Sequence, residues 1–384
     1  MRCLVAIASS MLSSISALAQ TAQHLVVSEV QTAGTSTQDE FVELYNPTAA
    51  PVNLAGWRLA RKTSSGTESN LLTSFPAVSI PARGFLLIAS AEYDTIAHEM
   101  ILPDVLYSTS QRLAADNTVI LYSDAAVSIV DKVAMGAATD REGIAAPNPV
   151  TNGSMERKAR SSSTPAALGD GGIDAFAGNG FDTDNNANDF VAQNDSHPQN
   201  SLSEVEGLLV RNTTTDAFFG SIQLGIDRAG AGHTLEVAEG IFSEELNVDK
   251  NLTLKGVQAG VDARSRAGGE SVVQKITIDS AAIDVTIDGF KLDIGTRTTF
   301  IRSDAAGSTT ITNIIVNGGY ASGDFSNPII LINRGATAVF SQNRVTDASG
   351  SDSMQSAIGF GPLTTTLTLQ ENDVVGGALA ITDL

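Results

Sequence analysis

Short runs of apolar and β-branched residues, separated by polar turns, dominate the first half of the chain. Residues 25–30 form the first run, the polar segment 35–39 follows, and residues 41–45 form a second run that Asn46 and Pro47 end. Runs of this length between turn residues predict the short strands of an antiparallel β-sandwich. Further runs of the same type are residues 85–88, 118–122 and 128–133.

Two residues of this half carry specific predictions. Trp57, the only tryptophan, follows Gly56 at the start of a strand-like run, and we interpret it as a core anchor, with a ligand platform as the alternative. In a period of two, Glu43 faces the same side as Phe41 and Tyr45. We expect Glu43 to make a structural hydrogen bond to nearby backbone, with a catalytic role as the alternative.

The second half, from Glu204 onward, contains an internal repeat. Four segments each begin with an apolar residue and have Leu or Val five positions later, and their first residues lie 24, 29 and 29 positions apart. A period of this size is typical of one turn of a solenoid, in which equivalent strands stack. Asn343 and Asn372 share a repeat position, and we expect them to stack at turns, with a ligand-binding row as the alternative. The four segments are residues 287–292, 311–316, 340–345 and 369–374.

The segments before this repeat resemble the entry of a known fold. Phe218, Ile222 and Ile226 recur at intervals of four, which predicts one short amphipathic helix. The helix, the strand-like run 235–246 and the sequence LTLKG at 252–256 together resemble the start of right-handed parallel β-helix proteins of the pectin lyase-like superfamily. The resemblance implies that the helix caps the first coil of a domain covering residues 204–384. Because the sequence stops within a strand-like run, we expect this β-helix to be incomplete at its C-terminus.

The first half resembles a lamin tail domain of the secreted bacterial type. The similarity covers residues 25–203 and implies an immunoglobulin-like β-sandwich. It also implies binding or tethering, with no catalytic residues to carry over. The motifs that carry it are EFVELYNP at 40–47, VNLAGWRL at 52–59, IPARGF at 80–85, NTVILY at 117–122 and GSMER at 153–157.

Residues 1–19 have the layout of a secretory signal peptide. Arg2 gives a positive start, residues 4–12 form an apolar core too short to span a bilayer, and Ala17-Leu18-Ala19 supplies a small-x-small cleavage pattern. The alternative is a buried N-terminal helix. No later run of 18 apolar residues occurs, so we expect a mature chain without a transmembrane segment, secreted or at the cell surface, with the periplasm also open.

The charge and the metal-ligating residues exclude several function classes. The formal net charge is −20, and an acidic chain repels phosphate backbones, so nucleic acid is not an expected partner. Cys3 lies inside the predicted signal peptide, which leaves the mature chain without a thiol. The four histidines are scattered singly with no H-x-x-x-H pair, which argues against zinc chemistry.

An acidic loop at residues 180–190 is the candidate metal site. Asp182, Asp184, Asn186 and Asn188 alternate along it, and calcium prefers six to eight oxygen ligands of this type. The loop lacks the Gly and the terminal acid of a helix–loop–helix calcium motif, and clusters of Asn, Asp and Gly are often plain turns. Calcium is therefore the only cofactor that the sequence suggests, and a purely structural loop is the alternative.

The predicted function is extracellular binding or adhesion, with a carbohydrate or a cell-surface component as the partner. A solenoid offers long faces rich in Thr, Asn and Asp, which suit extended polymers. The alternatives are a polysaccharide lyase or esterase and a purely structural surface stalk. We expect no catalytic site and a display surface without a reaction centre. Three or more ionisable groups converging in one groove of the second half would contradict this display hypothesis. The candidate charges there are dispersed along the sequence: Asp288, Lys291, Asp293, Arg302 and Arg334.

Overall fold

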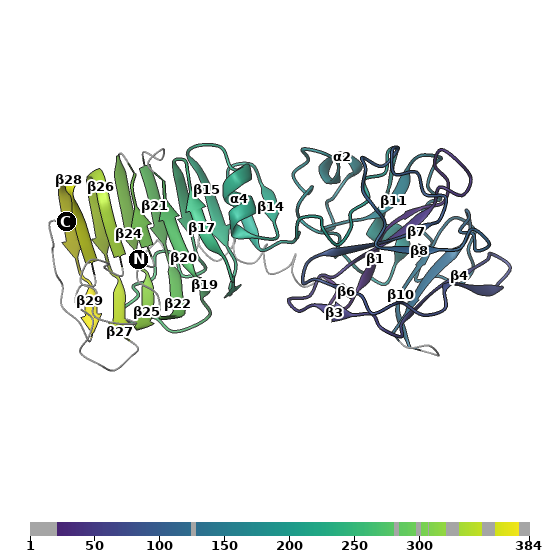
Figure 1. The fold of residues 1–384 in the computed structure, drawn as a ribbon, viewed down its shortest axis with the longest axis horizontal. Helices are drawn as coiled ribbons and strands as arrows, with labels where there is room; N and C mark the ends of the chain where they lie inside the picture. Colours follow the sequence, from purple (N-terminus) through teal and green to yellow (C-terminus); the bar gives the residue numbers. More distant parts are fainter. Residues whose placement is uncertain are drawn as a thin grey trace, which may run out of the picture. The chain divides into compact units, whose positions relative to one another are not determined.

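The computed structural model describes residues 21–123, 128–279, 284–296, 301–305, 307–319, 330–347 and 358–375. Their regular secondary structure is mostly β-strand, as expected, and they divide into two compact units between Leu208 and Leu209, five residues beyond the predicted boundary (Figure 1). The predicted signal peptide and the last residues of the chain lie outside the described residues. In the described part of the chain, no helix has the length and apolar character needed to cross a membrane.

The first unit contains a six-stranded sheet in the order β12-β11-β1-β2-β7-β8. Its pairs are antiparallel except for β7 and β8, which run parallel. The strands that the alternation predicted at 25–30, 41–45 and 85–88 form its centre. Its strands are β1 (Val26–Gln31), β2 (Phe41–Tyr45), β7 (Phe85–Ser90), β8 (Val105–Tyr107), β11 (Ser154–Arg157) and β12 (Phe190–Gln193).

A second sheet of four strands, in the order β10-β9-β4-β5, faces the first across the core. A two-stranded ribbon of β3 and β6 and the short helices α2 and α3 complete the unit. The elements are β3 (Val52–Asn53), β4 (Arg58–Lys62), β5 (Glu68–Leu72), β6 (Ser79–Ile80), β9 (Thr118–Tyr122), β10 (Ile129–Ala134), α2 (Pro165–Leu168) and α3 (Asn186–Asp189).

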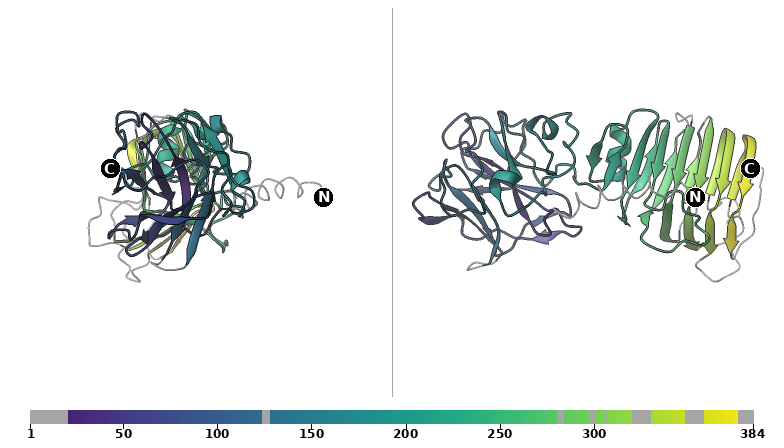
Figure 2. Two further views of the ribbon diagram at one scale, coloured as in Figure 1. Left: turned by 90° about the vertical axis from the view of Figure 1, so that its right-hand side faces the viewer. Right: turned by 180° about the vertical axis from the view of Figure 1, so that it is seen from behind.

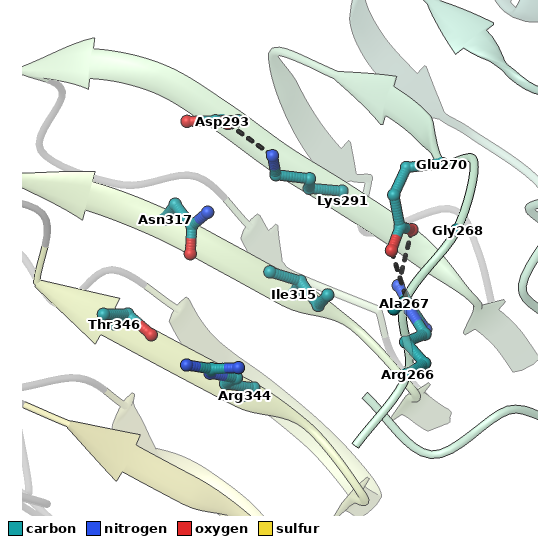
Figure 3. A pocket seen from close by; sticks show the side chains of 10 residues that line it. All are labelled: Arg266, Ala267, Gly268, Glu270, Lys291, Asp293, Ile315, Asn317, Arg344 and Thr346. Atoms are coloured by element: carbon teal, nitrogen blue, oxygen red, sulfur yellow. Dashed lines mark hydrogen bonds and ion pairs between the residues drawn. The ribbon is translucent and has the colours of Figure 1, made fainter. Parts of the chain in front are cut away.

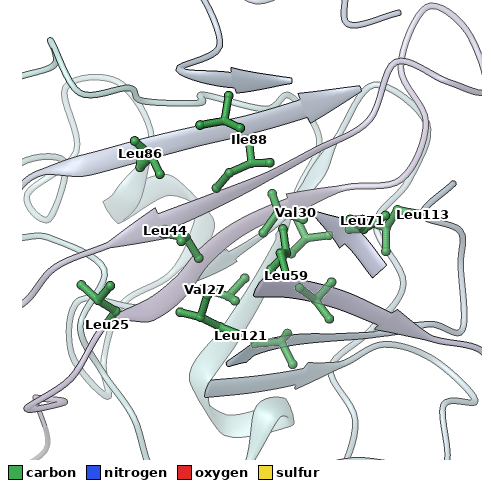
Figure 4. Close-up of a cluster of buried hydrophobic side chains, with 14 of the residues drawn as sticks. Leu25, Val27, Val30, Leu44, Leu59, Leu71, Leu86, Ile88, Leu113 and Leu121 are labelled. Atoms are coloured by element: carbon green, nitrogen blue, oxygen red, sulfur yellow. The ribbon is translucent and has the colours of Figure 1, made fainter. Parts of the chain in front are cut away.

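The core of this unit follows from the alternation of apolar residues. Val42 and Leu44 of β2 point to the same side as Leu86 and Ile88 of β7, and these side chains meet those of the four-stranded sheet (Figure 4). Burying side chains of this size stabilises the sandwich by about 1.5–3 kcal/mol each. Trp57 is partly buried and packs against this core, as predicted for an anchor.

The second unit begins with an antiparallel β-ribbon and one helix. The ribbon is β13 (Val210–Asn212) with β14 (Ala217–Phe219), and the helix α4 (Ile222–Arg228) follows. The predicted helix is present, but it does not include Phe218, which lies in β14. The reason is local: Ser221 caps the helix, because its side chain accepts a hydrogen bond from the backbone of Leu224 at 3.2 Å.

The remaining strands of the second unit pair in parallel with one another, in an eleven-stranded sheet that also includes the antiparallel β13 and β14 and in a second sheet of six strands (Figures 1 and 2). Following the chain, strands β17 to β25 alternate through three rows, and β26 and β28 are each long enough to join two of the rows. The strands are β15 (His233–Val237), β16 (Gly240–Ile241), β17 (Glu245–Val248), β18 (Leu252–Lys255), β19 (Ser271–Val273), β20 (Lys275–Ile278), β21 (Asp284–Asp288), β22 (Phe290–Thr296), β23 (Ile301–Ser303), β24 (Ser308–Thr312), β25 (Ile315–Gly319), β26 (Ile330–Ser341), β27 (Arg344–Asp347), β28 (Ile358–Gln370) and β29 (Asp373–Val375).

Strand register confirms the internal repeat. Ile287 pairs with Ile311, Ile311 with Phe340, and Phe340 with Leu369, so the first residues of all four segments lie side by side. The residue two positions after each of these has a positive φ and forms the corner between two rows. The four corner residues are Gly289, Asn313, Gln342 and Glu371, with φ of 78°, 53°, 55° and 52°.

The stacked asparagines occur where the repeat predicted them. Asn343 is fully buried, and its Nδ2 donates to the backbone oxygen of Ile311 and to Oδ1 of Asn372, each at 3.0 Å. Its Oδ1 accepts from the backbone nitrogen of Ile314 at 2.7 Å. Asn343 therefore satisfies backbone groups of the neighbouring turn, which confirms the structural interpretation of this row.

Candidate functional site

A groove of about 540 Å³ lies on the second unit, over strands β22, β25 and β27 (Figure 3). One wall is formed by the segment that leads into β19, and the floor by neighbouring parallel strands. Parallel strands lie about 4.8 Å apart, so equivalent side chains form rows across the floor. The lining residues are Arg266, Ala267, Gly268, Glu270, Lys291, Asp293, Ile315, Asn317, Arg344 and Thr346.

Strand register creates two rows of side chains in this groove. In the first row, Lys291 of β22 pairs with Ile315 of β25, and Ile315 with Arg344 of β27. In the second row, Asp293 pairs with Asn317, and Asn317 with Thr346. Because residues two apart on a strand face the same side, the two rows lie on one face. The groove therefore presents cationic and hydrogen-bonding groups at regular spacing along the stack.

Arg266 and Glu270 form the fixed wall of the groove. Their side chains are joined by two hydrogen bonds of 3.0 and 2.8 Å, and the Arg266 side chain is only 1% exposed. Arg266 also donates to the backbone oxygens of Asn313 at 2.5 Å and Phe290 at 3.0 Å. Arg266 consequently holds the wall against two turns of the strand stack, and Glu270 is neutralised within the protein.

Two glycines, Gly268 and Gly269, stand between these residues, and the structure explains why each is a glycine. A Cβ on Gly269 would lie 1.9 Å from Cδ of Glu239, so a side chain does not fit there. Gly268 adopts a φ of 141°, which L-residues rarely adopt. The pair of glycines thus lets the chain turn sharply between Arg266 and Glu270.

The other charges of the groove are more accessible. Lys291 Nζ and Asp293 Oδ2 form an ion pair of 2.6 Å, with side chains 25% and 45% exposed. Arg344 is exposed, and within the described residues it forms no ion pair, although Asp373 is its register neighbour on β29. The hydroxyl of Thr346 is buried without a hydrogen-bond partner among the described residues. Arg344 and Asn317 are therefore lining groups without a partner among the described residues, whereas the unpartnered Thr346 hydroxyl is covered.

The groove brings together two of the five candidate charges that are dispersed along the sequence. Lys291 and Asp293 lie together in it, whereas Asp288 and Arg302 belong to strands of the other sheet. The fifth candidate, Arg334, lies in β26, and its side chain is outside the described part. Sequence reasoning missed three charged lining residues, two from the segment before β19 and one from β27. These are Arg266, Glu270 and Arg344.

Five ionisable side chains line the groove, which meets the condition stated above against a display surface without a reaction centre. They carry three positive charges and two negative charges, one net positive charge on a chain of −20. Each carboxylate is closed in an ion pair with its own cation, Glu270 with Arg266 and Asp293 with Lys291. The arrangement suits the binding of polar or anionic groups, and it leaves no free carboxylate pair for acid–base chemistry among these residues.

The acidic loop of the first unit brings together only part of the predicted metal site. Oxygen atoms of Asp182 and Asp184 lie within 4.8 Å of one another and of Glu142, a residue that the sequence did not indicate. Glu142 lies about forty positions away along the chain, so no local spacing could reveal it. Asp182 is also 3.3 Å from the guanidinium of the fully buried Arg157, which neutralises part of the loop's charge.

The two predicted asparagine ligands are placed differently. Asn186 is buried, and its Oδ1 accepts from the backbone nitrogens of Ala134 at 3.0 Å and Glu142 at 3.4 Å. Its Nδ2 donates to the Glu142 carboxylate at 3.4 Å. Asn186 therefore positions Glu142 and has no free oxygen for an ion. Asn188 is exposed, and its backbone oxygen accepts from Lys158 at 2.7 Å.

The electrostatics of this cluster favour a cation. Burial, followed by the nearby carboxylates of Asp131 and Asp182, raises the pKa of Glu142 to about 7. A bound cation would reverse that effect, because it stabilises the ionised carboxylate. Calcium at Glu142, Asp182 and Asp184 stays a prediction, with a ligand set that differs from the expected one.

The first unit also has a sequence relationship. Residues 19–141 match the Lamin Tail Domain family. The matched segment contains strands β1 to β10, so the lamin-tail motifs of the first half are confirmed there. No curated protein matches the chain. Strands β11 and β12 and the whole second unit lie outside the lamin-tail match.

The lamin-tail segment supplies two members of a row of buried glutamates. Glu29 of β1 pairs in register with Glu43 of β2 and with Glu156 of β11. The segment after β12 covers this row: His197 N donates to Glu29 at 3.2 Å, and Gln199 N to Glu43 at 2.5 Å. Glu43 thus makes the structural hydrogen bonds that the alternation predicted.

Burial controls the charge of this row. Burial, together with the carboxylate of Glu156, raises the pKa of Glu29 to about 8. Burial and the carboxylate of Glu29 raise the pKa of Glu43 well above its usual value. The pKa of Glu156 is raised mainly by burial. Because protonation relieves the repulsion between neighbouring carboxylates, the first unit favours protonated members in this row.

Proposed function

We propose that this is an exported binding protein whose second unit holds an extended carbohydrate with anionic groups in the groove over β22, β25 and β27. In this proposal, the segment that matches the Lamin Tail Domain family is part of an immunoglobulin-like sandwich, and this sandwich tethers or presents the second unit. The three rows of parallel strands support the interpretation of that unit as a right-handed parallel β-helix. Residues 1–19 are proposed as its export signal.

One observation carries the proposal: Arg344 is exposed beside a buried, unpartnered Thr346 hydroxyl in a groove built from equivalent positions of successive turns. A buried polar group without a partner is unfavourable, and a ligand hydroxyl or carboxylate would satisfy it once the Thr346 side chain turns toward the groove. Arginine binds carboxylates through two parallel hydrogen bonds. Rows that repeat with the strand spacing suit a polymer that runs along the stack.

The enzyme alternative is less well supported by this geometry. A lyase or esterase needs a group free to accept a proton from the substrate or to attack it. In the groove, Glu270 is held by Arg266, and Asp293 by Lys291. A structural stalk, the third alternative, does not require an open arginine or an unpartnered hydroxyl.

Equilibrium binding to polygalacturonate and to its neutral methyl ester tests the proposal. We expect the full chain to prefer the anionic polymer, with affinity that falls as salt rises. Arg344→Ala should weaken binding by about ten- to a hundredfold, because one charge-assisted contact contributes roughly 1.5–3 kcal/mol. Arg302→Ala is the matched control, since Arg302 is an exposed arginine on the other sheet of the same unit.

Three results separate the alternatives. Equal binding by the wild type and Arg344→Ala contradicts the proposed site. Unsaturated products from polygalacturonate, or methanol released from the ester, identify an enzyme instead. Absence of binding to either polymer favours a stalk or a different ligand class and refutes the carbohydrate proposal.

A further inference from the structure

A second group of metal-ligating side chains lies in the first unit and shares no residue with the acidic loop. Glu99, Asp170 and His197 come from three separate segments, and their ligand atoms all lie within 4.8 Å of one another. Within the described part of the chain, neither Glu99 nor Asp170 has a side-chain hydrogen bond or an ion pair. Two unpaired carboxylates at this distance repel each other, and a bound cation removes that repulsion.

Hydrogen bonds hold the segments of Glu99 and His197 together. The buried His98, next to Glu99, lies with its Nδ1 3.1 Å from the Ser196 hydroxyl, next to His197. On the other side, the backbone nitrogen of His197 donates to the buried Glu29 carboxylate at 3.2 Å. Contacts outside the group therefore bring Glu99 and His197 together, so the pair does not depend on a bound ion for its position.

Asp170 is held by the turn that ends α2. Gly169 N donates to the backbone oxygen of Pro165 at 3.0 Å, and Gly172 N donates to that of Gly169 at 2.8 Å. Gln193 of β12 also donates to Pro165 at 3.3 Å, which ties this turn to the sheet. Asp170 is thus presented from a closed turn, while its side chain stays exposed.

The spacing fits a small ion after a modest movement. Two ligands of a tetrahedral ion with bonds of about 2.1 Å lie roughly 3.4 Å apart. The exposed carboxylates can close the remaining distance by rotating their side chains. A nitrogen ligand with two carboxylates matches zinc and similar transition metals, whereas calcium takes oxygen ligands alone.

We propose that Glu99, Asp170 and His197 bind one divalent transition metal ion, with Zn²⁺ as the representative case. The site links the loop before β8, the turn after α2 and the segment after β12, so the ion cross-links three loops of the first unit. Single, scattered histidines gave no sign of zinc in the sequence, because the three ligands are 71 and 27 positions apart. The inference is independent of the proposed carbohydrate groove, which lies in the other unit.

Calorimetric titration of the full chain with zinc chloride tests the site. We expect one ion bound by the wild type, and affinity roughly tenfold or more lower in His197→Ala, Glu99→Gln and Asp170→Asn, because each removes one of three ligands. His24→Ala is the matched control, since His24 lies 3.6 Å from a single carboxylate of Asp182 and should leave the affinity unchanged.

A second readout distinguishes loss of the site from loss of folding. Cobalt(II) added to the wild type should give a visible absorption band that His197→Ala lacks, while far-UV circular dichroism of the two proteins coincides. Glu99→Gln and Asp170→Asn alter exposed side chains, so they test the site even where His197→Ala unfolds. The proposal is overturned if the wild type binds no zinc, if all three variants bind zinc as tightly as the wild type, or if only Asp182→Asn abolishes binding.

Discussion

Replacing the buried asparagine of the repeat is the sharpest test of how the second unit holds together. In Asn343→Ala, the backbone nitrogen of Ile314 and the backbone oxygen of Ile311 both lose their partner inside the stack. Each buried group left unsatisfied costs about 1–3 kcal/mol, so we expect the free energy of unfolding to fall by roughly 2–5 kcal/mol. For a unit of this size, that corresponds to a melting temperature lower by about 5–15 °C.

The assay uses the single tryptophan to separate the two units. Trp57 packs against the core of the first unit, so its fluorescence follows unfolding of that unit alone. Calorimetry of the full chain records both units. We expect Asn343→Ala to lower one calorimetric transition and to leave the Trp57 transition unchanged.

A matched replacement sets the scale of the effect. Asn317 lies in the groove row without a hydrogen bond among the described residues, so Asn317→Ala should change stability by less than about 0.5 kcal/mol. The reasoning is refuted if the two alanine variants have the same stability, or if Asn343→Ala shifts the Trp57 transition.

Three further predictions concern the first unit, and each is read from the Trp57 transition of the full chain. Arg157→Met should lower the free energy of unfolding by about 3–5 kcal/mol, because it leaves the buried Asp131 carboxylate, 2.8 Å from the guanidinium, without its cation. A loss no larger than that of an exposed-residue substitution would contradict this prediction. Calcium should raise the melting temperature of the wild type and not that of Asp182→Asn, and an unchanged curve after chelation removes the calcium site. The free energy of unfolding should fall as pH rises from about 4.5 to 8. Glu29 has a raised pKa in the folded state, so over this range the unfolded state loses the Glu29 proton more readily than the folded state does. In Glu29→Gln this decline should be shallower, and a steeper decline contradicts the cause.

Much of the architecture could be predicted from the sequence. The alternation of residues 41–45 placed Val42 and Leu44 in the core and Glu43 on the opposite face, because the side-chain period of a strand is fixed at two. The four repeat segments predicted the strand register, because stacked turns align equivalent residues. Local sequence patterns of this kind are sufficient to predict strand faces and strand register where the same backbone geometry repeats along the chain.

The sites could be predicted only in part. Asp182 and Asp184 lie together as expected, but Glu142 joins them from another loop, and Asn186 supports Glu142 instead of facing the ion. The groove is also assembled from distant segments, since Arg344 of β27 and Lys291 of β22 line it together only because both strands stack on β25. Sequence spacing carries no information on which loops meet, so groups assembled from distant segments appear only in the structure.

The helix of the second unit shows how a local signal can override periodicity. Phe218 fits the spacing of Ile222 and Ile226, yet the helix starts only after Ser221. A serine cap satisfies the free backbone nitrogen of Leu224, and residues before the cap pair as the strand β14 instead. Capping residues therefore set the boundaries, while apolar spacing indicates only that a helix exists.

The most direct test of the central proposal is a crystal structure of the full chain with a galacturonate oligosaccharide bound. We expect the sugar to run across β22, β25 and β27, with one carboxylate on Arg344 and a hydroxyl on Thr346. An oligosaccharide bound elsewhere on the chain, or a cleaved product in the groove, would contradict the proposed binding function.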